Sequence, residues 1–428
     1  MSIKRRDFLQ LAAATTATGF VSSFGNYASA ASACSTANAI YQNVNGKFTD
    51  VQPVTLEERK QRIAKAQQLM QEHDINALIL DSGTSLLYFT GISWWPSERT
   101  MVAVIPAKGE VQYVCPAFEE GRLRELITLG NKVNIWQEDE SPFKQIRLTI
   151  NDSGINSGMI AIDETARFFI ADGLRKEAPD FEYINGNAVT MPCRMVKSDA
   201  EIALMQRAAD ITVAAIKVGI SKLKEGVSPD SISAAIAEAH AQMGAVNDFA
   251  DVTFGRMTSS PHGSIIPENL KKGDVVLLDC GCKVEGYSSD ITRSIIFGSN
   301  SSPKQLQIWQ LEKKAQATGF AAAKLGVPCE AVDAAARKVI TDAGLGPGYK
   351  LPGVPHRTGH GIGMDVHEYS YIVKGNKQPL VPGMCFSIEP TIIIPNEFGI
   401  RLEDCVYMKD EGPKWFSQPS PSIDQPFV

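Results

Sequence analysis

Two apolar segments that carry isolated carboxylates constrain the fold of this chain more than any other feature. In VVLLDCGCKVEGYSSDITRSIIF (275–297), an apolar run ends at Asp279, a turn follows around residues 284–286, and a second run carries Asp290. A tight antiparallel hairpin centred on Val284 and Glu285 would set the two aspartates directly opposite one another. Opposed residues have Cβ atoms roughly 4.5–5.5 Å apart, and like charges placed so are destabilising. We therefore expect a cation between them.

The same pattern recurs in MCFSIEPTIIIPNEFGIRLEDCVYM (384–408), where a symmetric register about Asn396 sets Glu389 opposite Glu403. Buried ionised carboxylates are costly unless they are paired or bind metal. Four of them need about four positive charges, which two divalent cations would supply. Carboxylates with one imidazole favour Mn²⁺, Co²⁺, Fe²⁺ or Zn²⁺ over a metal selected by thiolates. Cys280 and Cys282 alternate onto the other strand face and are poor ligand candidates.

A third segment, HRTGHGIGMDVHE (356–368), holds three of the six histidines, His356, His360 and His367. It follows a loop rich in Gly and Pro (344–355). His73 and His240 have no comparable context, and we expect both on helix surfaces.

The rest of the chain indicates two domains. A capping box, Thr55 to Glu58, opens a helix to about His73. Strands are expected at 76–81, 100–106 and 158–163, a turn-rich segment at 82–91, and a helix over 166–178. Alternating strands and helices predict an α/β domain over 55–190. A second domain over 195–410 begins with a helix capped by Ser198 and Glu201, whereas 31–54 is a leader and 411–428 a loosely attached tail.

The first thirty residues resemble a twin-arginine export signal. Arg5 and Arg6 precede a weakly apolar stretch, and Ala28-Ser29-Ala30 fits a cleavage site. The stretch is short and rich in Thr, Ser and Gly, so we expect no stable membrane anchor and a periplasmic or exported protein. Lipid modification of Cys34 is a minor alternative. No disulfide is assigned among the eight scattered cysteines.

The overall charge of the chain argues against a nucleic-acid partner. The formal net charge is −6, and no Lys/Arg run occurs beyond the extreme N-terminus. Nucleic acid is therefore not an expected partner.

The motifs LLDCGCKVEGYSSDITRS, HRTGHGIGMDVHE, FSIEP and GIRLED resemble, in order and spacing, the metallopeptidases of family M24, which have the pita-bread fold. These include aminopeptidase P, Xaa-Pro dipeptidase and methionine aminopeptidase. The resemblance implies a creatinase-like α/β N-terminal domain, an α+β pita-bread catalytic domain, and dimers or tetramers. It also implies a dinuclear site for two divalent ions, most simply Mn²⁺, with the ligands Asp279, Asp290, His360, Glu389 and Glu403.

The resemblance further implies roles on the substrate side. Glu389 would also shuttle a proton to the leaving nitrogen. His262 would contact the substrate near the reacting carbonyl, and His367 would hydrogen-bond that carbonyl. His356 would line the pocket on the leaving-group side, and Arg401 would organise the site beside Glu403.

The sequence is compatible with more than one substrate. Similar Xaa-Pro dipeptidases carry an arginine between the last histidine and the first glutamate ligand, whereas this chain has Lys374 and Lys377 there. That difference favours an Xaa-Pro aminopeptidase acting on peptides, with Xaa-Pro dipeptidase as the alternative. A dimethylsulfoniopropionate lyase, a creatinase-like amidinohydrolase and a binding protein on an inactive scaffold are less consistent with the ligand set. HEYSYI and EPTIII depart from the family pattern beside the pocket.

Two adjacent tryptophans, Trp94 and Trp95, have two interpretations. They are expected either to pack in the N-terminal core, which we favour, or to form an aromatic rim that reaches a neighbouring subunit.

Overall fold

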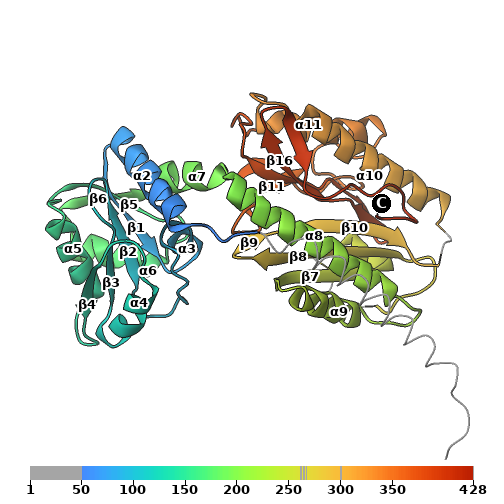
Figure 1. The fold of residues 1–428 in the computed structure, drawn as a ribbon. Coiled ribbons are helices and arrows are strands. Elements are labelled where there is room, and N and C mark those ends of the chain that lie inside the picture. The colour runs from blue at the N-terminus through green and yellow to red at the C-terminus, as the bar shows by residue number, and fades with distance from the viewer. Residues whose placement is uncertain (1–50, 261–262, 264–265, 267, 299–300, 428) are drawn as a thin grey trace, which may run out of the picture.

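The computed structural model describes residues 51–260, 263, 266, 268–298 and 301–427. Figure 1 shows two lobes side by side, joined where helix α7 (Asn187–Met195) leads into the long helix α8 (Asp199–Ser221). The export signal, Cys34 and His262 lie outside the described residues. No helix in the described part of the chain is long and apolar enough to cross a membrane.

The N-terminal lobe is a six-stranded mixed sheet in the order β4-β3-β2-β1-β5-β6. Its strands are β1 (Ile75–Asp81), β2 (Val102–Pro106), β3 (Gln112–Pro116), β4 (Lys132–Trp136), β5 (Gly158–Ile162) and β6 (Phe181–Asn185). Its other helices are α2 (Leu56–Glu72), α3 (Thr84–Thr90), α4 (Glu120–Leu126), α5 (Pro142–Asp152) and α6 (Phe168–Glu177).

Strand alternation explains why helices cover both faces of this sheet. Leu78 and Leu80 pack in one apolar cluster with α2, whereas Ala77 and Ile79 pack in another with α5 and α6. Successive side chains of a strand point to opposite faces. The result is a three-layer α/β/α lobe, as the alternating sequence pattern predicts.

The C-terminal lobe holds two larger sheets between pairs of helices, and a separate two-stranded sheet made of β14 and β15. One sheet has the order β10-β8-β7, with β9 paired to β8, and the other has the order β12-β11-β13-β16-β17. In Figure 1, α10 and α11 lie on one side of the strands and α9 on the other. The helices are α9 (Pro229–Gln242), α10 (Pro303–Ala322) and α11 (Cys329–Asp342). The strands are β7 (Val246–Phe254), β8 (Val275–Val284), β9 (Tyr287–Ser288), β10 (Ile291–Ile296), β11 (Gly359–Gly361), β12 (Glu368–Ile372), β13 (Cys385–Ile388), β14 (Thr391–Ile394), β15 (Phe398–Arg401), β16 (Asp404–Lys409) and β17 (Gly412–Trp415).

Of the two helix caps that the sequence predicts at the domain entries, one forms a complete capping box and the other forms only in part. At α8 the box is complete, because Ser198 accepts from the Glu201 backbone and Glu201 accepts from the Ser198 backbone. At α2 the structure shows Thr55 accepting from the Glu58 backbone, while the Glu58 carboxylate accepts instead from Arg62 and Ser198.

Four expectations are wrong. The turn-rich segment 82–91 contains helix α3, because Leu86 and Phe89 are fully buried and tertiary packing stabilises a short helix. His240 is fully buried and bonds Asn247 through Nδ1, at 2.8 Å. Trp95 is 83% exposed rather than packed in the core, although Trp94 is half-buried.

The fourth wrong expectation is that residues 411–428 form a loosely attached tail. Residues 412–415 form β17 against β16, and Phe416 and Ile423 are buried. Arg293, which is completely buried, donates to the carbonyl oxygens of Gln418 (2.9 Å) and Pro426 (3.3 Å). The composition of the tail, rich in Pro and Ser, could not reveal these backbone contacts.

Candidate metal centre

The first hairpin brings Asp279 and Asp290 to one face by a register that differs from the predicted one. Thr292, not Asp290, pairs with Asp279. The loop consists of Glu285 and Gly286, with φ of 49° and 84°, as in a two-residue hairpin turn that requires positive φ. The hairpin centre is thus one residue further along than expected. This moves the pairing by two residues, so Asp290 stays on the same face, diagonal to Asp279.

The second hairpin has the predicted register. Ile388 pairs with Asp404 and Thr391 with Arg401, so Glu389 and Glu403 face one another between these pairs. Backbone bonds between Thr292 and Glu403, at 3.2 and 3.3 Å, then join the two hairpins. This bridge brings all four carboxylates to one place.

His360, on the short strand β11, points its Nε2 atom into the carboxylates. Nε2 lies 3.1 Å from Glu389 Oε1, 3.4 Å from Asp290 Oδ2 and 4.0 Å from Glu403 Oε1. On the other side of the ring, Nδ1 is 3.1 Å from the carbonyl oxygen of Gly361, which makes it the donor. A histidine held in this way by a backbone carbonyl presents Nε2 for a cation.

The surroundings fit a divalent ion. Ligand atoms converge within 4.8 Å of one another in three overlapping groups, Asp279/Asp290/Glu403, His360/Glu389/Glu403 and Asp290/His360/His367. Glu403 is 1% exposed, and its Oε1 has no hydrogen-bond partner in the described part of the chain. Burial and the neighbouring carboxylates raise the pKa of Glu403 well above its ordinary value, and they raise the pKa of Asp290 to about 7. These carboxylates therefore need added positive charge to be ionised together.

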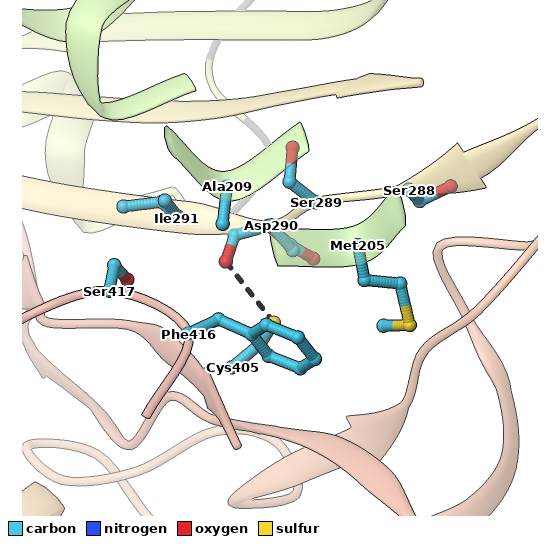
Figure 2. Close-up of a pocket in the computed structure, with 9 residues that line it drawn as sticks. All are labelled: Met205, Ala209, Ser288, Ser289, Asp290, Ile291, Cys405, Phe416 and Ser417. Carbon is cyan, nitrogen blue, oxygen red and sulfur yellow. Dashed lines mark hydrogen bonds between the residues drawn. The ribbon is translucent and has the colours of Figure 1, made fainter. Parts of the chain in front are cut away.

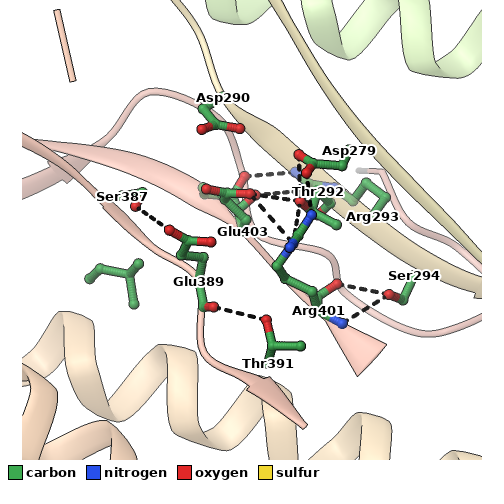
Figure 3. A network of polar contacts seen from close by, with 12 residues as sticks. Asp279, Asp290, Thr292, Arg293, Ser294, Ser387, Glu389, Thr391, Arg401 and Glu403 are labelled. Carbon is green, nitrogen blue, oxygen red and sulfur yellow. Dashed lines mark hydrogen bonds and ion pairs between the residues drawn. The ribbon is translucent and has the colours of Figure 1, made fainter. Parts of the chain in front are cut away.

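Arg401 already supplies some of that charge (Figure 3). Its Nη2 pairs with Asp279, and its Nε donates to Thr292 Oγ1 at 3.0 Å. The Thr292 hydroxyl also lies 3.0 Å from Asp279 Oδ1 and 2.6 Å from Glu403 Oε2. Because a guanidinium offsets one carboxylate, the charge count of the sequence overstated the charge that bound ions must provide.

Behind Asp290 the structure is closed. A cavity of about 10 Å³, no larger than one water, lies there between Met205, Phe416 and Cys405 (Figure 2). The Cys405 thiol donates to the Asp290 carbonyl at 3.3 Å. All seven described cysteines are buried and free, as small apolar residues would be.

On the open side lies a cavity of about 580 Å³, lined by Pro355, His356, Arg357, His360, His367, Glu389 and Arg401. His367 packs edge-on against His360, with ring centroids 4.1 Å apart, and its side chain is exposed. His356 lines the same cavity, but both its ring nitrogens have protein partners, the Arg357 carbonyl at 2.7 Å and Thr391 Oγ1 at 2.9 Å. The structure thus places His356, His367 and Arg401 beside the carboxylates.

Sequence reasoning missed three residues here. Thr292 links both hairpins, and the hairpin pairing could have revealed it, because it lies opposite Asp279. Ser387 donates to Glu389 Oε1 at 3.2 Å and accepts from the His360 backbone at 3.1 Å. Arg357 lines the cavity from the histidine segment 356–368. The dipeptidase pattern places its arginine elsewhere, between His367 and Glu389.

Comparison with known proteins agrees with this geometry. The model of metallopeptidase family M24 matches residues 203–410, and that of the creatinase/prolidase N-terminal domain matches 62–196. A putative dipeptidase of Bacillus subtilis is 31% identical over 82% of this chain and 96% of its own length. The Xaa-Pro dipeptidase of Lactobacillus helveticus is 32% identical over 82% and 95%. The crystal structure of a dipeptidase from Mycobacterium ulcerans superposes with a TM-score of 0.81 and 30% identity, over 88% of this chain and all of the other.

The predicted pita-bread architecture, with a creatinase-type N-terminal domain, is confirmed by these relatives. The two hairpins and the histidine strand form the candidate metal centre of a metallo-exopeptidase, and the chain belongs to metallopeptidase family M24.

Proposed function

We propose that this enzyme is an Xaa-Pro dipeptidase, the alternative in the sequence analysis, rather than an Xaa-Pro aminopeptidase. The observation that carries this proposal is Arg357, a cation in the cavity wall for which no carboxylate partner occurs among the described residues. The names of the dipeptidase relatives support the same conclusion.

Arg357 is held ready to bind an anion. Its guanidinium carbon lies 4.2 Å from the ring centroid of Tyr371, and stacking of this kind fixes the group while its N–H donors remain available. Its backbone is fixed as well, because the backbone N–H of the next residue, Thr358, donates to the buried Asp333 carboxylate at 3.2 Å. A dipeptide presents one free carboxylate close to its scissile bond, and an arginine can bind that group with two parallel hydrogen bonds. A longer peptide has an uncharged amide at that position.

The proposed metal ligands are those that the resemblance implies, with two ions, most simply Mn²⁺, bound by Asp279, Asp290, His360, Glu389 and Glu403. When bound, such ions lower the pKa of water and polarise the scissile carbonyl.

The chain's own residues then orient the substrate and move the proton. Glu389, whose Oε1 is held by Ser387, is placed to accept a proton and pass it to the leaving nitrogen. His367 is placed in the cavity wall to donate a hydrogen bond to the substrate carbonyl. His262 is proposed for a second substrate contact. Arg401 keeps Asp279 and Thr292 in position.

The test compares Gly-Pro, Gly-Pro amide and Gly-Pro-Gly as substrates of the metal-loaded wild type, Arg357→Leu, Arg357→Lys and Glu389→Ala. We expect the wild type to prefer Gly-Pro and Glu389→Ala to be inactive on all three. Loss of a charge-assisted hydrogen bond costs about 1.5–3 kcal/mol, so Arg357→Leu should lower kcat/KM for Gly-Pro by roughly 10- to 100-fold. The amide, which lacks the carboxylate, should be nearly unaffected.

Lys374→Leu provides the matched control, because it removes an exposed cation outside the cavity and should change nothing. An equal decrease in kcat/KM for Gly-Pro and for the amide would show that Arg357 does not bind the substrate carboxylate. Faster cleavage of Gly-Pro-Gly than of Gly-Pro by the wild type would support the aminopeptidase instead.

A further inference from the structure

The loop that presents His367 is fastened to the N-terminal lobe by buried ion pairs. Arg194, in α7, donates through Nη2 to Asp365 Oδ2 and to Glu368 Oε2, both at 2.6 Å. These two carboxylates flank His367 in the sequence, one on each side. A single guanidinium thus ties both sides of a histidine that itself points into the open cavity.

Two further contacts hold the same two carboxylates. The Lys197 ammonium pairs with Glu368, and Thr84 Oγ1, in the first turn of α3, donates to Asp365 Oδ1 at 2.6 Å. Three of the four charged residues are buried, with Arg194 7%, Lys197 5% and Glu368 8% exposed, whereas Asp365 is half-buried. Two cations oppose two carboxylates, so the group is close to electrically neutral and each charge depends on its partner.

The loop has little room to adjust. A Cβ atom added at Gly363 would lie 2.5 Å from Glu368 Oε1 and 2.7 Å from Lys197 Cε. The Gly363 carbonyl accepts from the Ser288 backbone at 2.8 Å, which fixes the same loop to the first hairpin. Contacts with both lobes therefore hold the loop. His367 is its exposed residue and lies between the anchored Asp365 and Glu368.

From this geometry we propose that Arg194 is a positioning residue for His367, so that the N-terminal lobe determines where this imidazole lies in the active site. The activity readout rests on the role of His367 in the proposed function. The positional part does not, because it concerns the order of residues 362–368.

The central variant is Arg194→Lys, which keeps the charge but cannot bridge two carboxylates with a planar group. It is combined with His367→Ala in a double-mutant cycle. Arg194→Lys alone should lower kcat by roughly 10- to 100-fold with bound metal unchanged, as for other residues that orient active-site groups. In the His367→Ala background the same substitution should cost less than about 3-fold, because the group it positions is gone.

Arg62→Lys is the matched control. Arg62 is another buried arginine between the lobes, 6% exposed, and it pairs with Glu58 (2.9 Å) and Glu201 (3.2 Å) without contacting the loop. Its effect should be the same factor in both backgrounds. Equal factors for Arg194→Lys in the two backgrounds, or full activity of Arg194→Lys, would overturn the proposal.

Hydrogen exchange provides the readout that does not depend on activity. In Arg194→Lys, amides of residues 362–368 should exchange faster, while those of the β14–β15 hairpin keep their protection. Unchanged exchange in 362–368 would also overturn the proposal. A wild type that cleaves no Xaa-Pro dipeptide would contradict the proposed function alone; the cycle would then use a peptide that is cleaved, or rest on exchange.

Discussion

Asp163, directly after β5, is a buried carboxyl far in sequence from the active site. It is 3% exposed, its Oδ1 accepts from the Thr165 backbone at 3.2 Å, and its Oδ2 has no hydrogen-bond partner among the described residues. Burial, with Glu164 next to it, raises the pKa of Asp163 to about 7. The folded protein therefore holds this proton more tightly than the unfolded chain does.

This predicts a stability that falls with pH. The contribution of Asp163 is fully present below the ordinary aspartate pKa of about 4 and is lost as the pH rises through about 7. Asp163→Asn mimics the protonated acid, so the urea midpoint of the N-terminal lobe should depend less on pH in this variant between about pH 4 and pH 8, which bracket the transition. The variant should be more stable than wild type at pH 8. The exposed Asp139→Asn is the control, and parallel pH profiles for wild type and Asp163→Asn would contradict the prediction.

Among elements, the turn of the first hairpin sets which residues face one another. Glu285 is exposed and has φ of 49°, a conformation that costs free energy in a residue other than Gly or Asn. Glu285→Asn should therefore raise the free energy of unfolding by roughly 0.5–1 kcal/mol with unchanged kcat, as measured by urea denaturation.

Gly286→Val is the opposing variant, since Gly286 has φ of 84° and a Cβ there would lie 3.1 Å from Met364 Cε. It should destabilise the protein, because a β-branched residue resists positive φ. If Glu285→Asn lowered stability, the turn would not be under the strain that its φ indicates.

The same turn shows what the sequence could and could not predict. Periodicity and carboxylate spacing predicted both hairpins and the convergence of Asp279, Asp290, Glu389 and Glu403. The shifted register did not disturb this, because side chains stay on the same face of a strand when the pairing moves by two residues. The turn type was missed, since Glu285 gives no signal for positive φ. His240 and Arg357 were missed because burial and cavity lining depend on contacts between distant segments, which no local pattern encodes.

At the scale of the whole molecule, bound metal should stabilise the C-terminal lobe selectively. The four carboxylates come from two hairpins, so an ion joins segments around residues 279, 290, 389 and 403 that otherwise repel. A ligand at about 100 times its Kd adds about 2.7 kcal/mol to the folded state.

Chelation should thus lower the melting temperature, and Mn²⁺ should restore it in a concentration-dependent way. Exchange should quicken in 275–296 and 385–404 but not in the N-terminal sheet. Glu403→Gln, which weakens the site, should show a smaller response to Mn²⁺. A melting temperature that ignores both chelator and metal would contradict this linkage.

The fastened tail has a consequence for how the chain folds as it is synthesised. Arg293 is fully buried, and its guanidinium is satisfied by Asp404 and by the carbonyls of Gln418 and Pro426. A buried guanidinium without these partners is costly, and residues 418–426 leave the ribosome after both hairpins. The active-site lobe can therefore close its core only once this segment has emerged from the ribosome.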